Sequence, residues 1–209
     1  MRLLAIVALA ISCHAAILDR IAVTVGKRVI TESDLIADIR LSAFLDRAPV
    51  DVSGEQRRKS ADRLVDQMLI LQEAAGGRAA LASEDDVARA LAQVKAQYGG
   101  EGNYRAALAR YEVSEQDVKA HLLAGLRAMR YTDLRFRPEV QLSEDEIQDF
   151  YESLAEQARE KRVPIASLKD SRQQVENLLT DRRTAQALDL WLGGQRREIQ
   201  ILYRDEVFK

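Results

Sequence analysis

The stretch "LDRIAVTVGKRVITESD", residues 18–34, decides how the chain closes on itself. The apolar residues Ile21, Val23 and Val25 alternate with smaller or polar ones, which is the two-residue period of a strand with one buried face. A Gly-Lys pair at residues 26–27 interrupts the run before it resumes, and this predicts a β-hairpin with glycine at the first turn position. An isolated two-stranded hairpin is only marginally stable in water, so this one needs a further partner.

The only other strand-like stretch lies at the far end of the sequence, in "EIQILYRDEVF", residues 198–208. Ile199, Ile201 and Tyr203 alternate there with Gln200 and Leu202. We therefore predict that a C-terminal strand joins the N-terminal hairpin in a small antiparallel sheet. That pairing would make residues 17–209 a single domain.

Between these ends the sequence is helical, and the fold class that we predict is mainly α. Apolar residues recur at steps of three and four, and the helix starts share a capping signature. The five capped starts are Thr31-x-x-Asp34, Ser53-x-x-Gln56, Ser83-x-x-Asp86, Ser114-x-x-Asp117 and Ser143-x-x-Glu146. Only those with Gln56 and Glu146 match the strict capping box, whereas the aspartates suit the positive end of the helix dipole. Gly193-Gly194 is expected to close the last helix.

Residues 1–16, "MRLLAIVALAISCHAA", have the order of a signal peptide: a positive start, a short apolar run and small residues before a cleavage site. The apolar run is shorter than the ~20 residues that span a bilayer. We predict cleavage after Ala15 or Ala16 and export to the periplasm. Lipid anchoring at Cys13, the single cysteine, fits less well because Ala10 stands where a lipoprotein usually has leucine.

Composition and motifs argue against most classes of catalytic site. The net charge of -2 gives no basic field for nucleic acid. His121 is the only histidine after the signal peptide, and it has no partner set for a metal or a nucleophile. The acidic runs at residues 84–86 and 144–146 lie in first helical turns, where the dipole explains them. "GGEGNY", residues 99–104, lacks the Lys-Ser/Thr of a phosphate loop. We expect no cofactor, no metal and no nucleotide.

The order of several weak motifs resembles the chaperone module of SurA and related periplasmic foldases of the PpiC group. After the signal peptide come the hairpin stretch and then a helix with "DRLVDQMLILQEA", residues 62–74. Two capped helices follow with "SEDDVARAL", residues 83–91, and "SEDEIQDFYE", residues 143–152. Last is "ALDLWLGGQRREIQILYRDE", residues 187–206. The resemblance covers nearly the whole chain after the signal peptide.

The resemblance implies a helical body closed by the C-terminal helix and strand, and ATP-independent binding of unfolded exported chains, outer-membrane proteins above all. Relatives insert parvulin isomerase domains after the "SEDEIQDFYE"-like helix. Here residues 159–167, which include Pro164, leave room only for a linker, so we expect a holdase and not an enzyme. The alternative is a non-catalytic envelope scaffold or adaptor that binds one specific folded partner.

The candidate peptide contacts are the large apolar residues that such a surface would use. They are Phe44, Met68, Tyr98, Tyr104, Met129 and Phe136. The alternative for each of them is a place in the core, because aromatic and Met residues at helical spacing are mostly buried. The sequence does not decide whether two protomers exchange helices to form a homodimer.

Overall fold

The computed structural model describes residues 19–76 and 82–209, so the predicted signal peptide and Cys13 lie outside the described residues. The described part has seven α-helices, three strands and two 3₁₀ turns, which confirms the mainly α fold class. In chain order they are β1 (Ile21–Val25), β2 (Arg28–Thr31), α1 (Glu32–Asp46), α2 (Gly54–Ala75), α3 (Glu84–Gln97), α4 (Glu101–Tyr111), α5 (Glu115–Phe136), η1 (Arg137–Glu139), α6 (Glu144–Glu160), α7 (Leu168–Glu198), β3 (Ile201–Tyr203) and η2 (Asp205–Phe208).

The sheet has the order β2-β1-β3, with both pairs of strands antiparallel. The two-residue turn predicted at residues 26–27 joins β1 to β2, and Gly26 has a φ of 57°, a left-handed conformation that glycine adopts without steric cost. β3 pairs with β1 through Thr24 and Leu202. The prediction that the C-terminal strand joins the N-terminal hairpin is therefore confirmed.

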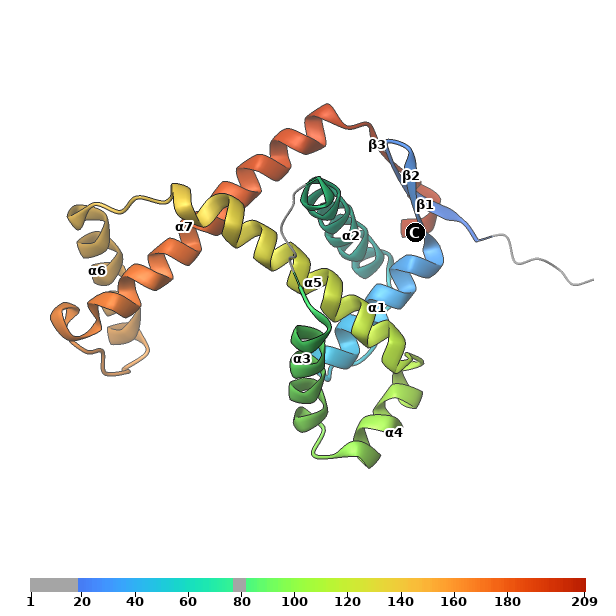
Figure 1. Cartoon of the computed structure of the whole chain (residues 1–209), viewed down its shortest axis with the longest axis horizontal. Coiled ribbons are helices and arrows are strands. Elements are labelled where there is room, and N and C mark those ends of the chain that lie inside the picture. The colour runs from blue at the N-terminus through green and yellow to red at the C-terminus, as the bar shows by residue number, and fades with distance from the viewer. Residues whose placement is uncertain (1–18, 77–81) are drawn as a thin grey trace, which may run out of the picture.

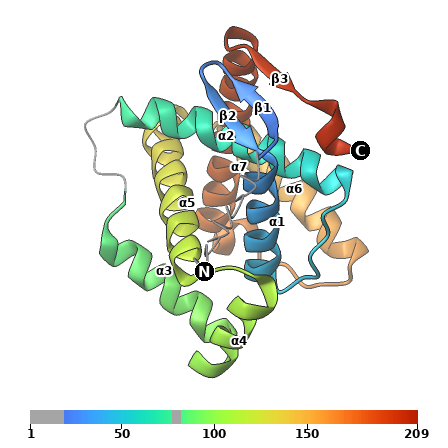
Figure 2. The same ribbon diagram turned by 90° about the vertical axis from the view of Figure 1, so that its right-hand side faces the viewer.

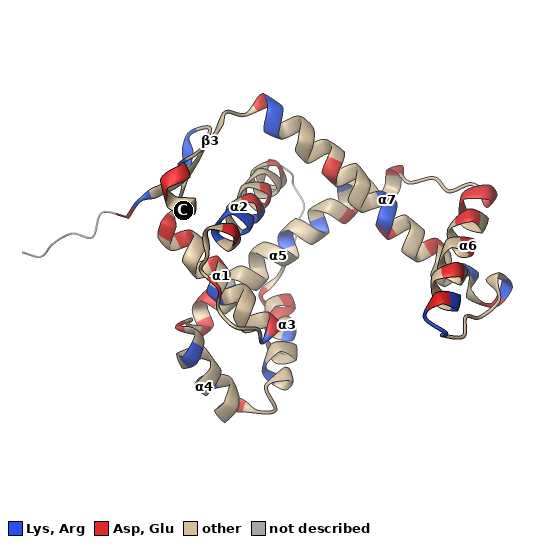
Figure 3. Ribbon diagram, turned by 180° about the vertical axis from the view of Figure 1, so that it is seen from behind, with Lys and Arg blue, Asp and Glu red and all other residues tan. Residues whose placement is uncertain are grey.

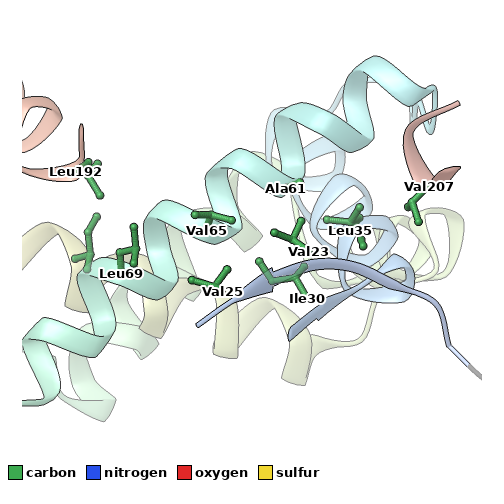
Figure 4. Close-up of a cluster of buried hydrophobic side chains, with 11 residues drawn as sticks. Val23, Val25, Ile30, Leu35, Ala61, Val65, Leu69, Leu192 and Val207 are labelled. Atoms are coloured by element: carbon green, nitrogen blue, oxygen red, sulfur yellow. The ribbon is translucent and has the colours of Figure 1, made fainter. Parts of the chain in front are cut away.

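The main hydrophobic core lies between this sheet and α2 (Figure 4). Val23 and Ile30 point from the sheet toward α2, where Ala61, Val65 and Leu69 receive them. Leu192 of α7 and Val207 of η2 extend the same cluster. Residues from both ends of the chain thus bury their apolar surface against one helix, and this burial stabilises the hairpin that would be marginal alone.

A second core joins α1, α3, α4 and the first half of α5, at the end of α5 remote from η1 (Figures 1 and 2). Its centre is aromatic. Phe44 stacks on Tyr98 with ring centroids 5.0 Å apart, while Tyr104 and Tyr111 meet Phe44 edge to face at 5.9 and 5.8 Å. Such offset and edge-to-face pairs are the favourable geometries for aromatic rings.

The third core is small and lies in an arm that consists of α6 and the first half of α7 (Figure 1). Ile147 of α6 packs against Val175 and Leu179 of α7, and Phe150 covers them. The α6–α7 arm projects away from the sheet, and α7 continues from it back to the main core (Figures 1 and 3). The arm is thus a helical pair inserted between the two parts of the chain that build the sheet.

The turn at the tip of this arm spans residues 161–167, between the end of α6 and the start of α7, and the linker predicted at 159–167 overlaps the last residues of α6. The first residues of the turn end α6 by the usual C-terminal hydrogen bonds: the Val163 amide donates to the Ala158 carbonyl at 2.8 Å and the Arg162 amide donates to the Arg159 carbonyl at 3.0 Å. Arg162 holds the left-handed conformation, with a φ of 54°, that glycine usually supplies there.

All five capped helix starts are confirmed, but the assignment of the strict boxes was wrong. In each of the five, the cap hydroxyl accepts from the backbone amide three residues on. The reciprocal bond forms in all three aspartate caps as well as with Glu146, and it is absent only from the cap at Ser53 and Gln56. A short carboxylate three residues after the cap therefore closes the box as well as glutamate does.

The predicted end of the last helix at Gly193-Gly194 was wrong, because α7 continues to Glu198. Leu192 is buried in the main core, and Arg196, one turn further on, donates to the Asp66 carboxylate at 2.8 Å and to the Asp62 carbonyl at 3.1 Å. These contacts outweigh the intrinsic helix propensity of glycine, which is only about 1 kcal/mol below that of alanine.

A polar network fixes β3 to α2 beside this helix end. The Tyr203 hydroxyl donates to the Asp62 carboxylate at 2.6 Å, and the guanidinium carbon of Arg58 lies 3.7 Å from the centre of the Tyr203 ring. Burial, and then the bond to Asp62, raises the pKa of Tyr203. The third strand is therefore held by side chains as well as by its pairing with β1.

Candidate functional site

A hollow with a volume of about 790 Å³ lies between α3 and α5. These two helices are antiparallel neighbours (Figure 2) and are joined by an ion pair at each end. Near the start of α3, the Asp86 carboxylate lies 2.7 Å from the Arg130 guanidinium. Near its end, the Lys95 ammonium lies 2.8 Å from the Glu115 carboxylate. We call the space between these two pairs the α3–α5 groove.

The middle of the α3–α5 groove is lined by aliphatic side chains, several of them small. Ala88 and Ala92 of α3 and Ala120 of α5 are exposed, and Leu123 is half-buried. Leu91 lies deeper and also belongs to the aromatic core. Because alanine fills little of the space between two helices, the gap stays open where larger residues would interlock.

The charged side chains at one end of this groove are those of Lys95, Lys119 and Glu115. Glu115 lies 2.8 Å from both Lys119 and Lys95, and the hydrogen bonds from these two ammonium groups lower its pKa. The bond to Glu115 in turn raises the pKa of Lys95. Both groups therefore stay charged at neutral pH, and Arg127 adds a cation toward the other end of the groove.

A second hollow, of about 400 Å³, lies on the other flank of α5. We call it the α1–α2 hollow, because Ala37 and Leu41 of α1 and Leu64, Met68 and Leu71 of α2 line it. Residues 28–30 of β2 form its rim, and His121 of α5 stands at its edge.

Two carboxylates line the α1–α2 hollow, and both are already bonded within the protein: Asp34 accepts from the Thr31 backbone amide at 2.8 Å in the capping box. Asp38 is buried, and it accepts from the Ser60 hydroxyl at 2.7 Å and from the Arg63 guanidinium at 2.6 Å. This buried carboxylate therefore has its hydrogen-bond partners within the protein. The remaining lining is mostly aliphatic, so the hollow offers an apolar surface.

The helix α5 is thus a ridge with one apolar depression on each flank. Gln116, Ala120, Leu123 and Arg127 follow one another at helical steps along the α3–α5 groove, whereas His121, one residue after Ala120, faces the α1–α2 hollow. Two adjacent depressions of this kind suit apolar side chains that lie several residues apart on an extended chain.

Half of the predicted contact residues are core residues. Phe44, Tyr104 and Phe136 are almost completely buried. The first two centre the aromatic core, and Phe136 packs against Tyr131 and Trp191 with centroids 6.5 and 6.0 Å apart. In this conformation none of the three presents a surface to a ligand, and the core interpretation left open for them is the one that the structure supports.

The other three predicted residues are accessible to different extents. Met68 lines the α1–α2 hollow and also touches the main core. Met129 is 55% exposed on α5 but lines neither depression. Tyr98 is half-buried in the aromatic core, where its hydroxyl donates to the Phe44 carbonyl and burial raises its pKa. Of the six, only Met68 lies in a candidate site.

The polar groups that could suggest catalysis have structural partners. Asp86 and Glu146 close capping boxes and pair with arginines. Within residues 19–76 and 82–209, no three His, Cys, Asp or Glu side chains gather as metal ligands would. In the same described ranges, no helix is long and apolar enough to cross a membrane.

No protein-family model matches this chain, and no match is found among curated proteins. The resemblance to SurA-like chaperone modules therefore stays a prediction.

The groove residues of α3 and α5 were not among those predicted from the sequence. The sequence feature that could have indicated them is the presence of alanines at positions 88, 92 and 120 on otherwise polar helix faces. Alanine is a strong helix former and is common on helix surfaces, so that signal is weak without knowledge of which helices are neighbours.

Proposed function

We propose that this protein is an ATP-independent chaperone, a holdase, that binds unfolded exported polypeptides in the periplasm, with outer-membrane proteins among its clients. The observation that carries the proposal is the α3–α5 groove, a depression of about 790 Å³ that is open to solvent and has an aliphatic middle between charged ends. Unfolded chains expose apolar side chains that self-associate, and an aliphatic groove removes them from water in the same way as a protein core does.

The chemistry of the groove favours broad recognition. Alanine and leucine present no directional polar groups, so discrimination between client sequences is weak and each site contributes modestly. The neighbouring α1–α2 hollow lets one extended client occupy two depressions at once, which raises the total affinity without further specificity. Export of the mature chain after residue 16 would place it where outer-membrane proteins pass as unfolded chains.

Suppression of aggregation tests the proposal. Two urea-denatured outer-membrane barrel proteins are diluted into buffer with the protein at equimolar ratio, and light scattering is followed. The wild-type chain is expected to suppress scattering from both clients. Leu123→Glu places a charge in the α3–α5 groove and is expected to weaken client binding about fivefold or more, as the loss of about 1 kcal/mol of apolar contact implies.

Leu190→Glu is the matched control, because Leu190 is 79% exposed on α7 and lines neither depression. It is expected to behave as wild type. Failure of the wild-type chain to suppress aggregation of either client would contradict the proposal. One tight stoichiometric complex with a single folded envelope protein, without holdase activity, would favour the adaptor function instead. Acceleration of proline-limited refolding would contradict the assignment as a non-enzyme.

A further inference from the structure

The strand β2 stands at the edge of the sheet, next to the α1–α2 hollow. Among residues 19–76 and 82–209, the order β2-β1-β3 gives β2 one partner and places no strand on its other side. Edge strands with free backbone groups are templates for another extended chain. What the edge offers depends on which residues of β2 direct their N–H and C=O groups outward.

Two backbone hydrogen bonds at the ends of the β1–β3 pairing fix this orientation. The Gly26 amide donates to the Gln200 carbonyl at 2.9 Å, and the Arg204 amide donates to the Ala22 carbonyl at 2.9 Å. Hydrogen-bonded and non-bonded pairs alternate along an antiparallel ladder. The backbone groups of Ala22, Thr24 and Gly26 therefore face β3, and those of the residues between them face β2.

It follows that the bonded pairs toward β2 are Val25 with Arg28 and Val23 with Ile30. Val29 lies between these pairs, opposite Thr24, so its N–H and C=O point away from the sheet. The Val29 side chain is 47% exposed. Within the described part of the chain, Val29 thus presents a backbone donor and a backbone acceptor without a partner, beside an exposed aliphatic side chain.

The α1–α2 hollow begins at this edge, since residues 28–30 line it together with Met68 and Leu71 of α2. Ile30 points from β2 toward α2 (Figure 4), and Val29 points to the opposite face because side chains alternate along a strand. In a chain paired with β2, the residue opposite Val29 would share the outer face, and its two neighbours would point toward α2 and the hollow.

We propose that β2 receives an extended segment of an unfolded client as a fourth strand, antiparallel to β2 as the other neighbours in this sheet are, with alternate apolar side chains of that segment in the α1–α2 hollow. The ligand is an extended chain with apolar residues at every second position, as in the strands of a barrel. This inference rests on the proposed chaperone function and names the mode of binding at one of its sites. Backbone bonds supply affinity independent of sequence, and the hollow selects the alternating pattern.

The register of the proposed strand gives a test in which the protein is unchanged. A fluorescein-labelled heptapeptide of alternating Thr and Val is compared with two N-methylated forms by fluorescence anisotropy. With valines in the hollow, a threonine amide faces Val29. Methylation of the Thr amides is therefore expected to weaken binding about tenfold or more, because it removes hydrogen bonds to β2 and adds a steric clash. Methylation of the Val amides is expected to change affinity by less than about twofold, because those amides point away from β2.

A substitution in the chain supports the same test. Val29→Pro removes the outward-pointing N–H of β2, which forms no bond within the sheet. It is expected to weaken binding of the unmethylated peptide about fivefold or more. The circular dichroism spectrum of the protein is expected to be unchanged. If the parent peptide binds and the two methylated forms bind equally well, the edge-strand inference is overturned and the chaperone function stands. If neither the peptide nor the denatured clients bind, both proposals fail.

Discussion

At the scale of single residues, Gly54 has the least freedom to change. It is the first residue of α2, and a Cβ built on it would lie 1.9 Å from the Phe208 carbonyl oxygen. Arg57 strengthens the same contact between α2 and η2, because it donates to the Val207 carbonyl at 2.9 Å. Its guanidinium also lies 3.2 Å from the Glu32 carboxylate. The absence of a side chain at residue 54 is what allows η2 to dock on the start of α2.

Gly54→Ala is expected to destabilise the protein by about 1–3 kcal/mol, because the contact is with backbone atoms that cannot rotate away. The matched control is Gly125→Ala in α5, where a Cβ would meet nothing within 4 Å and higher helix propensity should add up to about 1 kcal/mol of stability. Urea unfolding followed by circular dichroism measures both. Equal effects of the two substitutions would show that η2 does not dock at Gly54.

Residue type alone could not separate buried from accessible candidates. Phe44 and Met68 both lie at helical spacing among apolar neighbours, yet Phe44 centres the aromatic core and Met68 lines the α1–α2 hollow. The difference arises from what each helix faces, which is a property of packing and not of the local pattern. The sequence could therefore predict that both residues contact other apolar groups, but not whether those groups belong to the core or to a ligand.

At the scale of elements, the helix starts could be predicted well because each depends on residues that are close in sequence. A hydroxyl at the cap and a carboxylate three residues on satisfy backbone groups locally, as at Ser143 and Glu146. The end of α7 could not be predicted in this way, because its last turn depends on contacts with Asp62 and Asp66 of α2, which is distant in sequence. Long-range contacts of this kind leave no periodic trace in the sequence.

The α6–α7 arm is expected to be the least stable element, because its buried core contains only Ile147, Val175 and Leu179. Leu179→Ala should lower the free energy of local unfolding of the arm by about 2–4 kcal/mol. A core this small is expected to unfold locally after such a loss. Hydrogen exchange is then expected to become fast in α6 while α2 and the sheet keep their protection.

Leu178→Ala is the control for this prediction, since Leu178 is adjacent in α7 but exposed. It should leave exchange in α6 nearly unchanged. Loss of protection in α2 as well as in α6 on the Leu179 substitution would mean that the arm and the body unfold as one unit, contrary to the expectation.

At the scale of the whole molecule, the capping carboxylates couple stability to pH. Hydrogen bonds from the cap residue lower the pKa of Asp86, Asp117 and Glu146 below their ordinary values. The folded state therefore binds fewer protons than the unfolded chain at these groups. The stability that these carboxylates contribute is fully present above their unfolded-state pKa values of about 4. It is lost as the pH falls through their lowered folded-state pKa values.

We expect the urea midpoint of unfolding to fall as the pH drops below about 4. A triple variant with Asp86→Asn, Asp117→Asn and Glu146→Gln should be less stable at neutral pH and should lose less stability on acidification. Urea titrations of both proteins from pH 7 to 2.5 measure this. Parallel pH curves for the variant and the wild type would assign the acid sensitivity to other groups.

The candidate site also belongs to this scale, which explains why it was the part least predictable from the sequence. The α3–α5 groove exists because two ion pairs, Asp86–Arg130 and Lys95–Glu115, join helices across a gap that small side chains do not fill. Neither pair is evident until α3 and α5 are known to be antiparallel neighbours. The closure of the sheet by the C-terminal strand, in contrast, followed from the lack of any other strand-like stretch.

That closure has a kinetic consequence. The central strand β1 is completed by β3, and α2 receives Val207 at its start, so contacts essential to the main core join the two extremes of the described chain. Contacts between residues so distant in sequence raise the contact order and slow folding, because a long loop must close before they form. The helices can form before β3 is paired, but the three-stranded sheet is complete only when Ile201–Tyr203 reach β1. We therefore expect the sheet to be completed late in folding, with a helical intermediate that lacks β3 as the species most exposed to aggregation.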